Sequence, residues 1–581
     1  MTRRIVRDDR GQHKPRSPQG ASPLRYSAGM RLGSLFFKVA LAAAAVFAPA
    51  AATAVDCARA DAEGHAHVAG IALAQGDWPL ASGSLTCAAD ASSDTEVAER
   101  ATRAAFENFQ LEDAVRSATR WLALQPEREE ARRFLATSLL RLYRNTAAAA
   151  QFRTILDSAY EDRAQGYTAL LGILAGERNE TGAALVMEQL AAADPGLAEA
   201  QHARSVLWQQ AENGARALEA ARRARELRPG WRLAELAEVR ALLAAGQTDD
   251  GLALAASLAA DADPLSQLNY AWLLVGARRD EDARQAFETL RRGQVAATEA
   301  LEGLGTLAFT RRDYDSALRH FNELAQGSRG NETALAFLGL IADEQGKPEL
   351  AVRYLERVVT GPRAVASQLR AYRLMETLGA SPRAELALAD FIEQSPESIR
   401  DVVAGRASQL ADAGRRDEAV ALMRRASRYY PDDDDLRLAE AFVLERLDRV
   451  PEAIAVMREV LRRRPDDPTA LNSLGYTLAD RTGKAAEGYG LIVRALEVKP
   501  DSYAIMDSAG WALFRLKRNA EALEWLERAW GRSRDPEVAA HLGEVLWAAG
   551  RRDEARDLWR RAREESPDNR SLQRTMERHP G

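Results

Sequence analysis

The chain has 581 residues, of which 46% are apolar, 28% are charged and 6% are aromatic. One hydrophobic core stops growing near roughly 250–300 residues, so the chain must hold several domains or many copies of one unit. A net charge of −6 argues against a nucleic-acid-binding protein, and two cysteines exclude a framework of many disulfides or zinc sites. The low aromatic content, with abundant Ala, Leu, Glu and Arg, predicts an all-α protein.

Residues 1–54 are predicted to be an N-terminal extension and a signal peptide. The apolar stretch Val39–Ala54 follows the basic residues Arg31 and Lys38 and ends in a small-x-small pattern typical of a cleavage site. Its 16 residues are fewer than the roughly 20 that a membrane-spanning helix needs, which favours a cleaved signal over a retained anchor. Met30 would open a better-proportioned signal and is a candidate for the true start. We therefore expect an exported, periplasmic protein.

The two cysteines, Cys57 and Cys87, lie close to the expected cleavage site. Asp56 precedes Cys57, whereas a lipid attachment site would have a small residue there, so we expect a soluble exported protein rather than a lipoprotein. An oxidising compartment would let Cys57 and Cys87 form a disulfide. The alternative, that they stay unpaired, is left open by the sequence. If residues 62–75 and 78–91 form a helical hairpin, Cys57 reaches Cys87 only where the preceding tail folds back.

The rest of the chain repeats one unit of about 34 residues. The string Gly-Arg-Arg-Asp-Glu-Ala occurs at 414–419 and again at 550–555, a distance of four such periods. Prolines recur in two series at gaps of 34 or 35 residues, or close to twice that: Pro126, Pro195, Pro229 and Pro264, and again Pro396, Pro431, Pro465, Pro500 and Pro567. A period of this length is the signature of a stacked repeat architecture.

Each unit is predicted to form two amphipathic helices. In the last copy, Val538, Leu542 and Val545 have the spacing of one helical face, and Gly550 marks the break before the second helix. Pro567 cannot continue that second helix. Since one hairpin cannot bury its own apolar face, neighbouring hairpins must stack.

These units resemble tetratricopeptide repeats. That family has a small residue at position 8, Ala at 20, a large apolar residue at 24, Ala at 27 and Pro at 32. Gly543, Ala555, Trp559, Ala562 and Pro567 match all five positions. The resemblance implies an α-solenoid, a right-handed superhelix of about fifteen repeats. We divide it into a degenerate first repeat (55–92), an N-terminal and middle array (93–397), a well-matched C-terminal array (398–569) and a capping tail (570–581).

The sequence shows no catalytic arrangement. His65 and His67 lie two residues apart, on different faces of a helix, which is unsuitable for a zinc pair. The acidic run 432–435 opens a helix, where carboxylates cap free amides, and this interpretation is favoured over a cation site. The tract Arg462–Arg464 is interpreted as part of a solvated helix face. We therefore expect no enzyme activity, no cofactor and no metal site.

The resemblance also implies where partners bind, because in this family the first helix of each repeat lines the concave face. Residues mapped to that face by position are Asn472, Tyr476, Asp507, Trp511, Phe514 and Trp547. Aromatic side chains there would anchor a peptide or a partner helix. For Trp511 and Trp547, a place in the core is the open alternative, whereas Trp525 and Trp559, on second helices, are expected to be core residues.

Residues 467–535 carry a closer resemblance. The runs Leu471–Asp480 and Asp507–Trp511 are similar to the C-terminal repeats of a proteobacterial group of exported repeat proteins. In that group, an outer-membrane lipoprotein is the adaptor that presents peptidoglycan hydrolases to a periplasmic carboxyl-terminal processing protease. The resemblance implies a non-enzymatic adaptor with protein partners, among them such a protease and cell-wall hydrolases, near the outer membrane. The alternative is a scaffold subunit of an envelope polysaccharide synthesis or export complex. No nucleic acid partner is expected, and the oligomeric state stays open.

Overall fold

The computed structural model describes residues 55–75, 77–260, 264–293, 296–327, 331–567 and 569–579. Within these ranges the protein consists of 31 α-helices and two short 3₁₀ helices, η1 (Cys57–Arg59) and η2 (Pro396–Ser398). The expected signal peptide, residues 1–54, lies outside the described residues. None of the described helices is both long enough and apolar enough to cross a bilayer.

Thirty of the helices follow one another as fifteen pairs, which confirms the predicted all-α solenoid and its number of units. The first helices of the pairs are α2 (Ala62–Gln75), α4 (Thr95–Glu107), α6 (Glu129–Arg141), α8 (Arg163–Leu174), α10 (Ala198–Gln210), α12 (Arg232–Ala244), α14 (Pro264–Gly276), α16 (Ala297–Thr310), α18 (Asn331–Glu344), α20 (Ala364–Thr377), α22 (Ile399–Asp412), α24 (Asp434–Arg446), α26 (Pro468–Arg481), α28 (Tyr503–Arg515) and α30 (Pro536–Ala548).

The second helices are α3 (Trp78–Ala91), α5 (Leu111–Leu124), α7 (Asn145–Ala159), α9 (Glu180–Ala191), α11 (Gly214–Leu227), α13 (Thr248–Ala259), α15 (Asp280–Arg292), α17 (Tyr314–Ala325), α19 (Pro348–Leu355), α21 (Ser381–Gln394), α23 (Arg416–Tyr429), α25 (Val450–Arg463), α27 (Ala485–Val498), α29 (Asn519–Arg532) and α31 (Arg552–Glu565). A last helix, α32 (Arg570–Arg578), packs against α30 and α31 at the C-terminal end.

Local sequence explains where these helices begin. Asp433, Asp467 and Asp535 precede first helices, and their carboxylates accept hydrogen bonds from backbone amides of the first turn at 2.8–3.0 Å. This confirms the capping interpretation for Asp433, inside the acidic run. The second helices α23, α25, α29 and α31 begin differently, with an Arg just before the helix paired to a Glu three residues on, as in Arg449–Glu452 and Arg551–Glu554. The acidic partner in the first turn also opposes the helix dipole.

The small residue of each first helix sets how closely the pair packs. A Cβ atom added to Gly543 would collide with the indole of Trp559, which is 1% exposed. A Cβ atom on Gly510 would lie 2.5 Å from Cγ of Leu526, on the second helix of that pair. Glycine therefore lets a large side chain of the second helix lie directly on the first helix, which is the physical reason for the repeat pattern.

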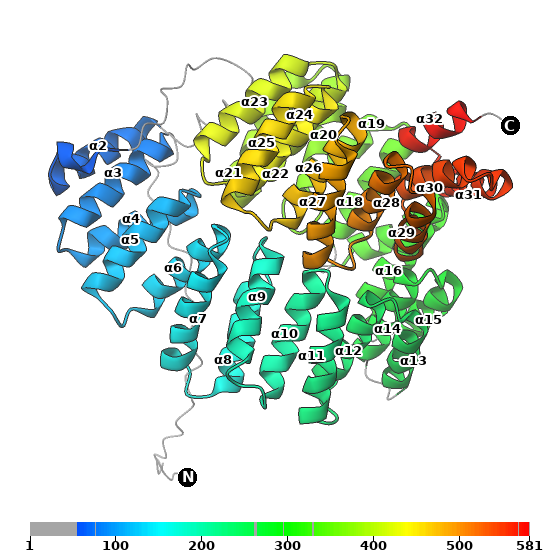
Figure 1. Ribbon diagram of the computed structural model, residues 1–581, viewed down its shortest axis with the longest axis horizontal. Coiled ribbons are helices and arrows are strands. Elements are labelled where there is room, and N and C mark those ends of the chain that lie inside the picture. Colours follow the sequence, from blue (N-terminus) through cyan, green and yellow to red (C-terminus); the bar gives the residue numbers. More distant parts are fainter. Residues whose placement is uncertain are drawn as a thin grey trace, which may run out of the picture.

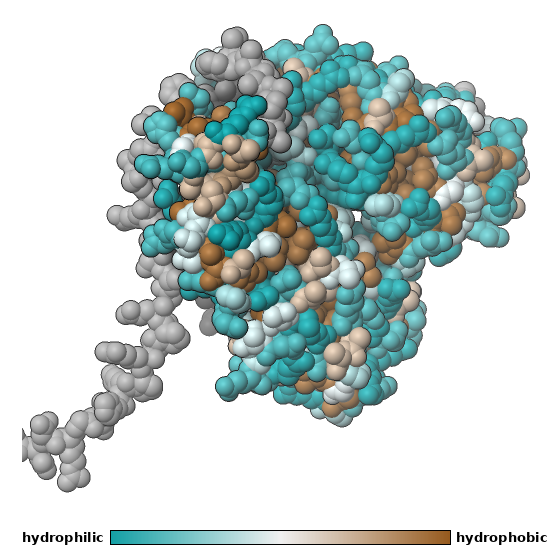
Figure 2. Space-filling model, turned by 60° about the vertical axis from the view of Figure 1, so that its left-hand side comes forward, coloured by the Kyte–Doolittle hydropathy of each residue, from teal (hydrophilic) through white to brown (hydrophobic). Residues whose placement is uncertain are grey.

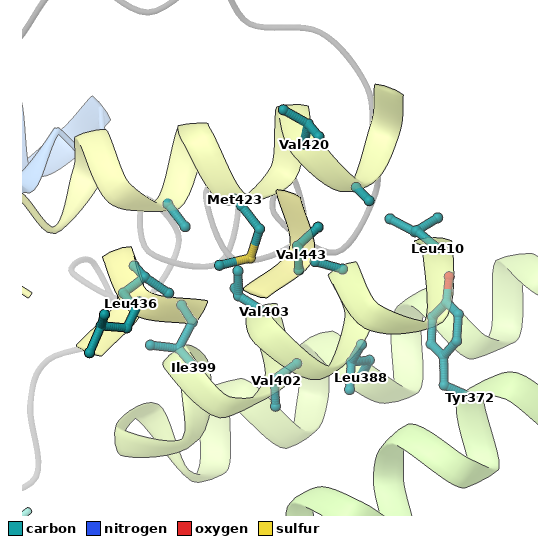
Figure 3. Close-up of a cluster of buried hydrophobic side chains, with 14 of the residues drawn as sticks. Tyr372, Leu388, Ile399, Val402, Val403, Leu410, Val420, Met423, Leu436 and Val443 are labelled. Carbon is teal, nitrogen blue, oxygen red and sulfur yellow. The ribbon is translucent and has the colours of Figure 1, made fainter. Parts of the chain in front are cut away.

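The hydrophobic core is a layer that runs along the solenoid. Figure 3 shows one section of it, in which Tyr372 and Leu388 from α20 and α21 are followed by Val402 and Leu410 from α22 and Met423 from α23. Each pair contributes side chains to the layers on both sides, so that stability comes from contacts between neighbours.

The stack bends with its first helices on the inside. First helices of consecutive pairs pack against each other at most steps, as α26 does with α28 and α28 with α30, whereas consecutive second helices seldom touch. The bend carries the chain through a full turn, so the yellow and orange helices of the C-terminal half lie beside the blue and cyan helices of the N-terminal half (Figure 1).

Polar contacts join the two turns at what we call the seam. They connect residues 223 to 320 positions apart in the sequence. The seam includes the bonds Glu112 N to Asp432, Gly214 N to Asp501, and the ion pairs Arg178–Asp401, Lys499–Glu180 and Arg278–Glu565, at 2.6–3.1 Å. On the face of the molecule in Figure 2, hydrophilic residues predominate and hydrophobic ones lie in strips between them.

At the N-terminal end, the segment before α2 folds back onto α3. Cys57 in η1 forms a disulfide with Cys87 of α3, and Nε2 of the buried His65 lies 3.1 Å from the carbonyl oxygen of Cys57. The disulfide thus ties the first hairpin to the residues that precede it.

Candidate functional site

The first helices of three consecutive pairs bring five side chains together, which we call the inner-face cluster. It comprises Tyr476 and Asp480 from α26, Asp507 and Trp511 from α28, and His541 from α30. Residues four apart share one face of a helix, and the repeat period brings those faces into line from one pair to the next.

The cluster is held by specific contacts. The imidazole of His541 stacks on the indole of Trp511, with ring centroids 4.3 Å apart. The centroid of the Tyr476 ring lies 6.2 Å from that of the His541 imidazole. Nε1 of Trp511 donates to Oδ1 of Asp480 at 2.9 Å. Nδ1 of His541 lies 2.9 and 3.0 Å from the two carboxylate oxygens of Asp507. The rings of Trp511 and His541 are therefore each fixed by a neighbouring repeat.

Carboxylates dominate the electrostatics of this surface. Burial by itself lowers the pKa of His541, but the charge and hydrogen bond of Asp507 outweigh burial, so that its pKa is raised. Burial raises the pKa of the Tyr476 hydroxyl, and the charges of Asp480 and Asp507 raise it further. A protonated His541 is thus favoured, whereas an anionic Tyr476 is not.

Two more carboxylates, Glu445 and Glu537, lie at the edge of the cluster. Burial raises the pKa of both groups, and Glu445 accepts a hydrogen bond of 2.8 Å from the hydroxyl of Thr477. Their charges also act on Tyr476 and raise its pKa. A cation next to Tyr476 would stabilise both carboxylates in their ionised form.

The structure brings most of the predicted site residues together. Asn472 precedes Tyr476 by one turn of α26, and Phe514 lies 5.3 Å from Trp511 between ring centroids. Trp511 is only 8% exposed, so its indole supports the surface from within rather than standing open on it. The core alternative thus describes its position.

Trp547 lies apart from the cluster, near the C-terminal cap. Its ring is half-buried, 5.0 Å from the ring of His579 and 6.0 Å from that of Trp559, and the guanidinium groups of Arg552 and Arg556 lie over it. Trp559 is a core residue, as predicted. Trp525 is half-buried, with the guanidinium of Arg528 over its ring, so it belongs to the core only in part.

Position mapping alone missed His541, Asp480, Glu445 and Glu537. Asp480 lies four residues after Tyr476 in α26, and His541 lies 34 residues after Asp507, one repeat further on. A search for ionisable residues one helical turn or one repeat period away from each mapped residue would have found both. Among the described residues, no group of His, Cys, Asp and Glu has the arrangement of a metal site.

A cleft of 860 Å³ lies at the seam, between the N-terminal helices and the segment from η2 to Arg464, just after α25. Aromatic rings in its lining carry guanidinium groups above them: Arg141 over Phe106 at 4.5 Å and Arg400 over Phe109 at 4.4 Å. Such stacking keeps the cations partly desolvated between the two turns.

Arg464, which also lines the cleft, corrects a prediction. Its side chain is only 4% exposed, whereas the sequence had indicated a solvated helix face. It pairs with Asp434, Asp435 and Asp467 at 2.8–3.3 Å, and its guanidinium lies 3.5 Å from the ring centroid of Tyr143 in the other turn. The returning turn of the solenoid covers this position, which no local pattern reveals.

Comparison with known families agrees with the geometry. The tetratricopeptide repeat family matches residues 410–474, and it matches again at 268–332, 302–368 and 476–537. Three stretches of the chain, 268–368, 410–474 and 476–537, thus match tetratricopeptide repeats. The TPR repeat-containing protein PA4667 of Pseudomonas aeruginosa is 30% identical over 207 residues, which cover 36% of this chain. The match spans about a third (35%) of the length of that relative.

Several solved repeat structures are also similar. Yeast Tom70 is 13% identical and the Cut9 complex with Hcn1 is 14% identical, with coverage of 89% and 90% of this chain and of 94% and 96% of theirs. Their TM-scores are 0.32 and 0.30. A repeat protein of Thermus thermophilus, TTC0263, is 23% identical over 31% of this chain and 97% of its own, with a TM-score of 0.28. No conclusion rests on these superpositions.

Proposed function

We propose that this protein is an exported, non-enzymatic adaptor that delivers substrate proteins to a periplasmic carboxyl-terminal processing protease. Tetratricopeptide repeats indicate a protein-interaction scaffold, and the observation that carries the proposal is the inner-face cluster. Its rings and carboxylates lie on three consecutive first helices, at the place where the sequence resembles the adaptors of such proteases. A rigid, aromatic-rich surface of this kind suits the binding of an extended partner segment.

Two observations support export. The segment 1–54 has the composition of a signal peptide, and Cys57 and Cys87 form a disulfide, a bond that persists in oxidising compartments such as the periplasm. Fractionation of cells that produce a C-terminally tagged full-length chain tests this step. The tag should appear in the periplasmic fraction at the mass of a chain lacking residues 1–54, and recovery in the cytoplasm at full mass would contradict export.

Affinity capture tests the adaptor role. Tagged residues 55–581 serve as bait in an envelope extract, and captured proteins are identified by mass spectrometry. We expect a serine protease of the carboxyl-terminal processing type together with cell-wall hydrolases. Recovery of polysaccharide synthase or export subunits instead would replace the adaptor with an envelope export scaffold.

A further inference from the structure

The carboxylates around Tyr476 outnumber the cations that face them. The charges of Glu445, Asp480, Asp507 and Glu537 all act on the phenol and raise its pKa. Asp480 lies one helical turn after Tyr476 on α26, and Glu445 accepts a hydrogen bond from the adjacent Thr477. The cations paired with this set are His541, on Asp507, and Arg515, which lies 3.0 Å from Asp480. Glu537 has no ion pair with a Lys or Arg among the described residues. Glu445 has no ion pair there either, because Arg481, whose charge acts on it, forms its ion pair with Asp448. Glu445 and Glu537 are therefore both without an ion pair of their own.

Two other groups near Tyr476, on α24 and α26, are also unpaired or exposed. Oδ1 of Asn472 is buried and finds no hydrogen-bond donor in the described part of the chain, although a buried acceptor without a donor costs free energy. Phe442, 34 residues before Tyr476 and on the neighbouring first helix α24, is 39% exposed. An unpaired acceptor, a phenol ring and an exposed apolar ring thus accompany the excess negative charge.

We propose that the inner face around Tyr476, Asn472 and Glu537 binds a lysine or arginine side chain of the partner polypeptide. The cation lies against the Tyr476 ring and between the carboxylates of Glu445 and Glu537, as cations do on aromatic faces rimmed by negative charge. The apolar stem of the bound side chain packs toward Phe442. This inference rests on the proposed function in one respect, that the partner is a polypeptide.

Charge complementarity decides the chemistry of the occupant. An acidic segment would bring further negative charge next to Glu445 and Glu537, which burial already makes harder to ionise, and a purely apolar segment would leave both without a counter-ion. A basic side chain adds no negative charge and supplies the counter-ion. The partner segment is therefore basic at the residue that this surface holds.

Peptide binding to tagged residues 55–581 tests the proposal, with fluorescence anisotropy at 0.15 M salt as readout. The probe is a labelled octapeptide of alternating Lys and Ala, compared with its acetyl-lysine form and with alternating Glu and Ala. We expect binding of the lysine peptide alone, since acetylation removes the charge and keeps the length.

Two variants and one control localise the site. Tyr476→Leu removes the aromatic face and Glu537→Gln removes one charge, and each should weaken binding about tenfold. Glu524→Gln, an exposed carboxylate on the second helix α29, is the matched control and should keep affinity within about twofold. Circular dichroism of each variant verifies that it is folded.

Equal affinity for the acetylated peptide, equal weakening by Glu524→Gln, or no binding of the lysine peptide would overturn the inference. The adaptor proposal is tested separately, by whether the unsubstituted bait captures the protease and the hydrolases at all. Capture that persists unchanged with Tyr476→Leu and Glu537→Gln would reject the basic-residue site and leave the adaptor in place.

Discussion

At the scale of single residues, the inner-face cluster combines support and recognition. Trp511 is buried and hydrogen-bonded, and it carries the ring of His541, whereas Tyr476 stays half-buried next to unpaired carboxylates. A substitution of Trp511 should thus affect stability, whereas a substitution of Tyr476 should affect binding. Sequence mapping placed both residues on the partner-binding face, with a place in the core as the alternative for Trp511, and the structure separates the two roles.

Trp511→Ala should be far more destabilising than Trp547→Ala. Loss of a buried aromatic ring, together with its hydrogen bond to Asp480, costs about 3 kcal/mol, whereas the half-buried Trp547 should cost about 1 kcal/mol. Urea unfolding followed by circular dichroism measures both values. Equal free energies of unfolding for the two variants would mean that Trp511 is not embedded as the structure shows.

The pair His541–Asp507 should make stability depend on pH. Because the pKa of His541 is raised above 6.5 in the folded chain, its pairing contributes stability that is fully present below pH 6.5 and is lost as pH rises through the folded-state pKa. Asp507→Asn removes that contribution. The Tm difference between wild type and Asp507→Asn should therefore be larger at pH 5.5 than at pH 9.

Asp553→Asn serves as control for that titration, because the Asp553 side chain is 98% exposed. Its Tm difference from wild type should be small and similar at both pH values. A difference for Asp507→Asn that grows toward high pH would contradict the assigned charge state of His541.

At the scale of helices, the repeat pattern is a packing rule. Glycine in the first helix is needed where a side chain of the second helix lies on it, whereas some other helical glycines face open space. Gly490 in α27 is exposed, and a Cβ atom there would meet nothing within 4 Å. The two kinds of glycine should respond oppositely to one substitution.

Gly543→Ala should destabilise the C-terminal repeats by roughly 1–3 kcal/mol, because the added methyl group collides with the indole of Trp559. Gly490→Ala should instead stabilise the protein by about 0.5–1 kcal/mol, since alanine restricts the unfolded chain and favours the helix. Thermal and urea unfolding of both variants tests the rule. Stabilisation by Gly543→Ala would show that this pair of helices is looser than described.

At the scale of the whole molecule, the polar seam holds two turns together. Its ion pairs and hydrogen bonds include Arg178–Asp401 and Lys499–Glu180, both partly exposed to solvent. Exposed ion pairs weaken when salt screens them, with a Debye length of about 3 Å at 1 M. We therefore expect the seam to open while the stacked repeats remain folded.

Small-angle X-ray scattering should show a larger radius of gyration at 1 M salt, and for the double variant Arg178→Glu with Lys499→Glu, at unchanged helicity. Arg560→Glu is the matched control, because Arg560 pairs with Asp557 within α31 and not across the seam. An unchanged radius in all conditions would contradict a seam held by charge.

Sequence alone predicted the local part of this structure. The fifteen hairpins and the cap within the acidic run 432–435 follow from spacing within one or two repeats. The buried Arg464 could not be predicted, because Tyr143, on which it lies, is 321 positions earlier in the sequence and the bend of many repeats brings them together. The pairing of His541 with Asp507 joins adjacent repeats, but His541 was not among the residues mapped to the concave face.

Capture from an envelope extract with tagged residues 55–581 tests the central claim most directly. The account predicts that a carboxyl-terminal processing protease and cell-wall hydrolases are recovered together, and that Tyr476→Leu with Glu537→Gln lowers the yield of the partner held by its basic residue. Recovery of polysaccharide synthase or export subunits, with neither protease nor hydrolase, would contradict it.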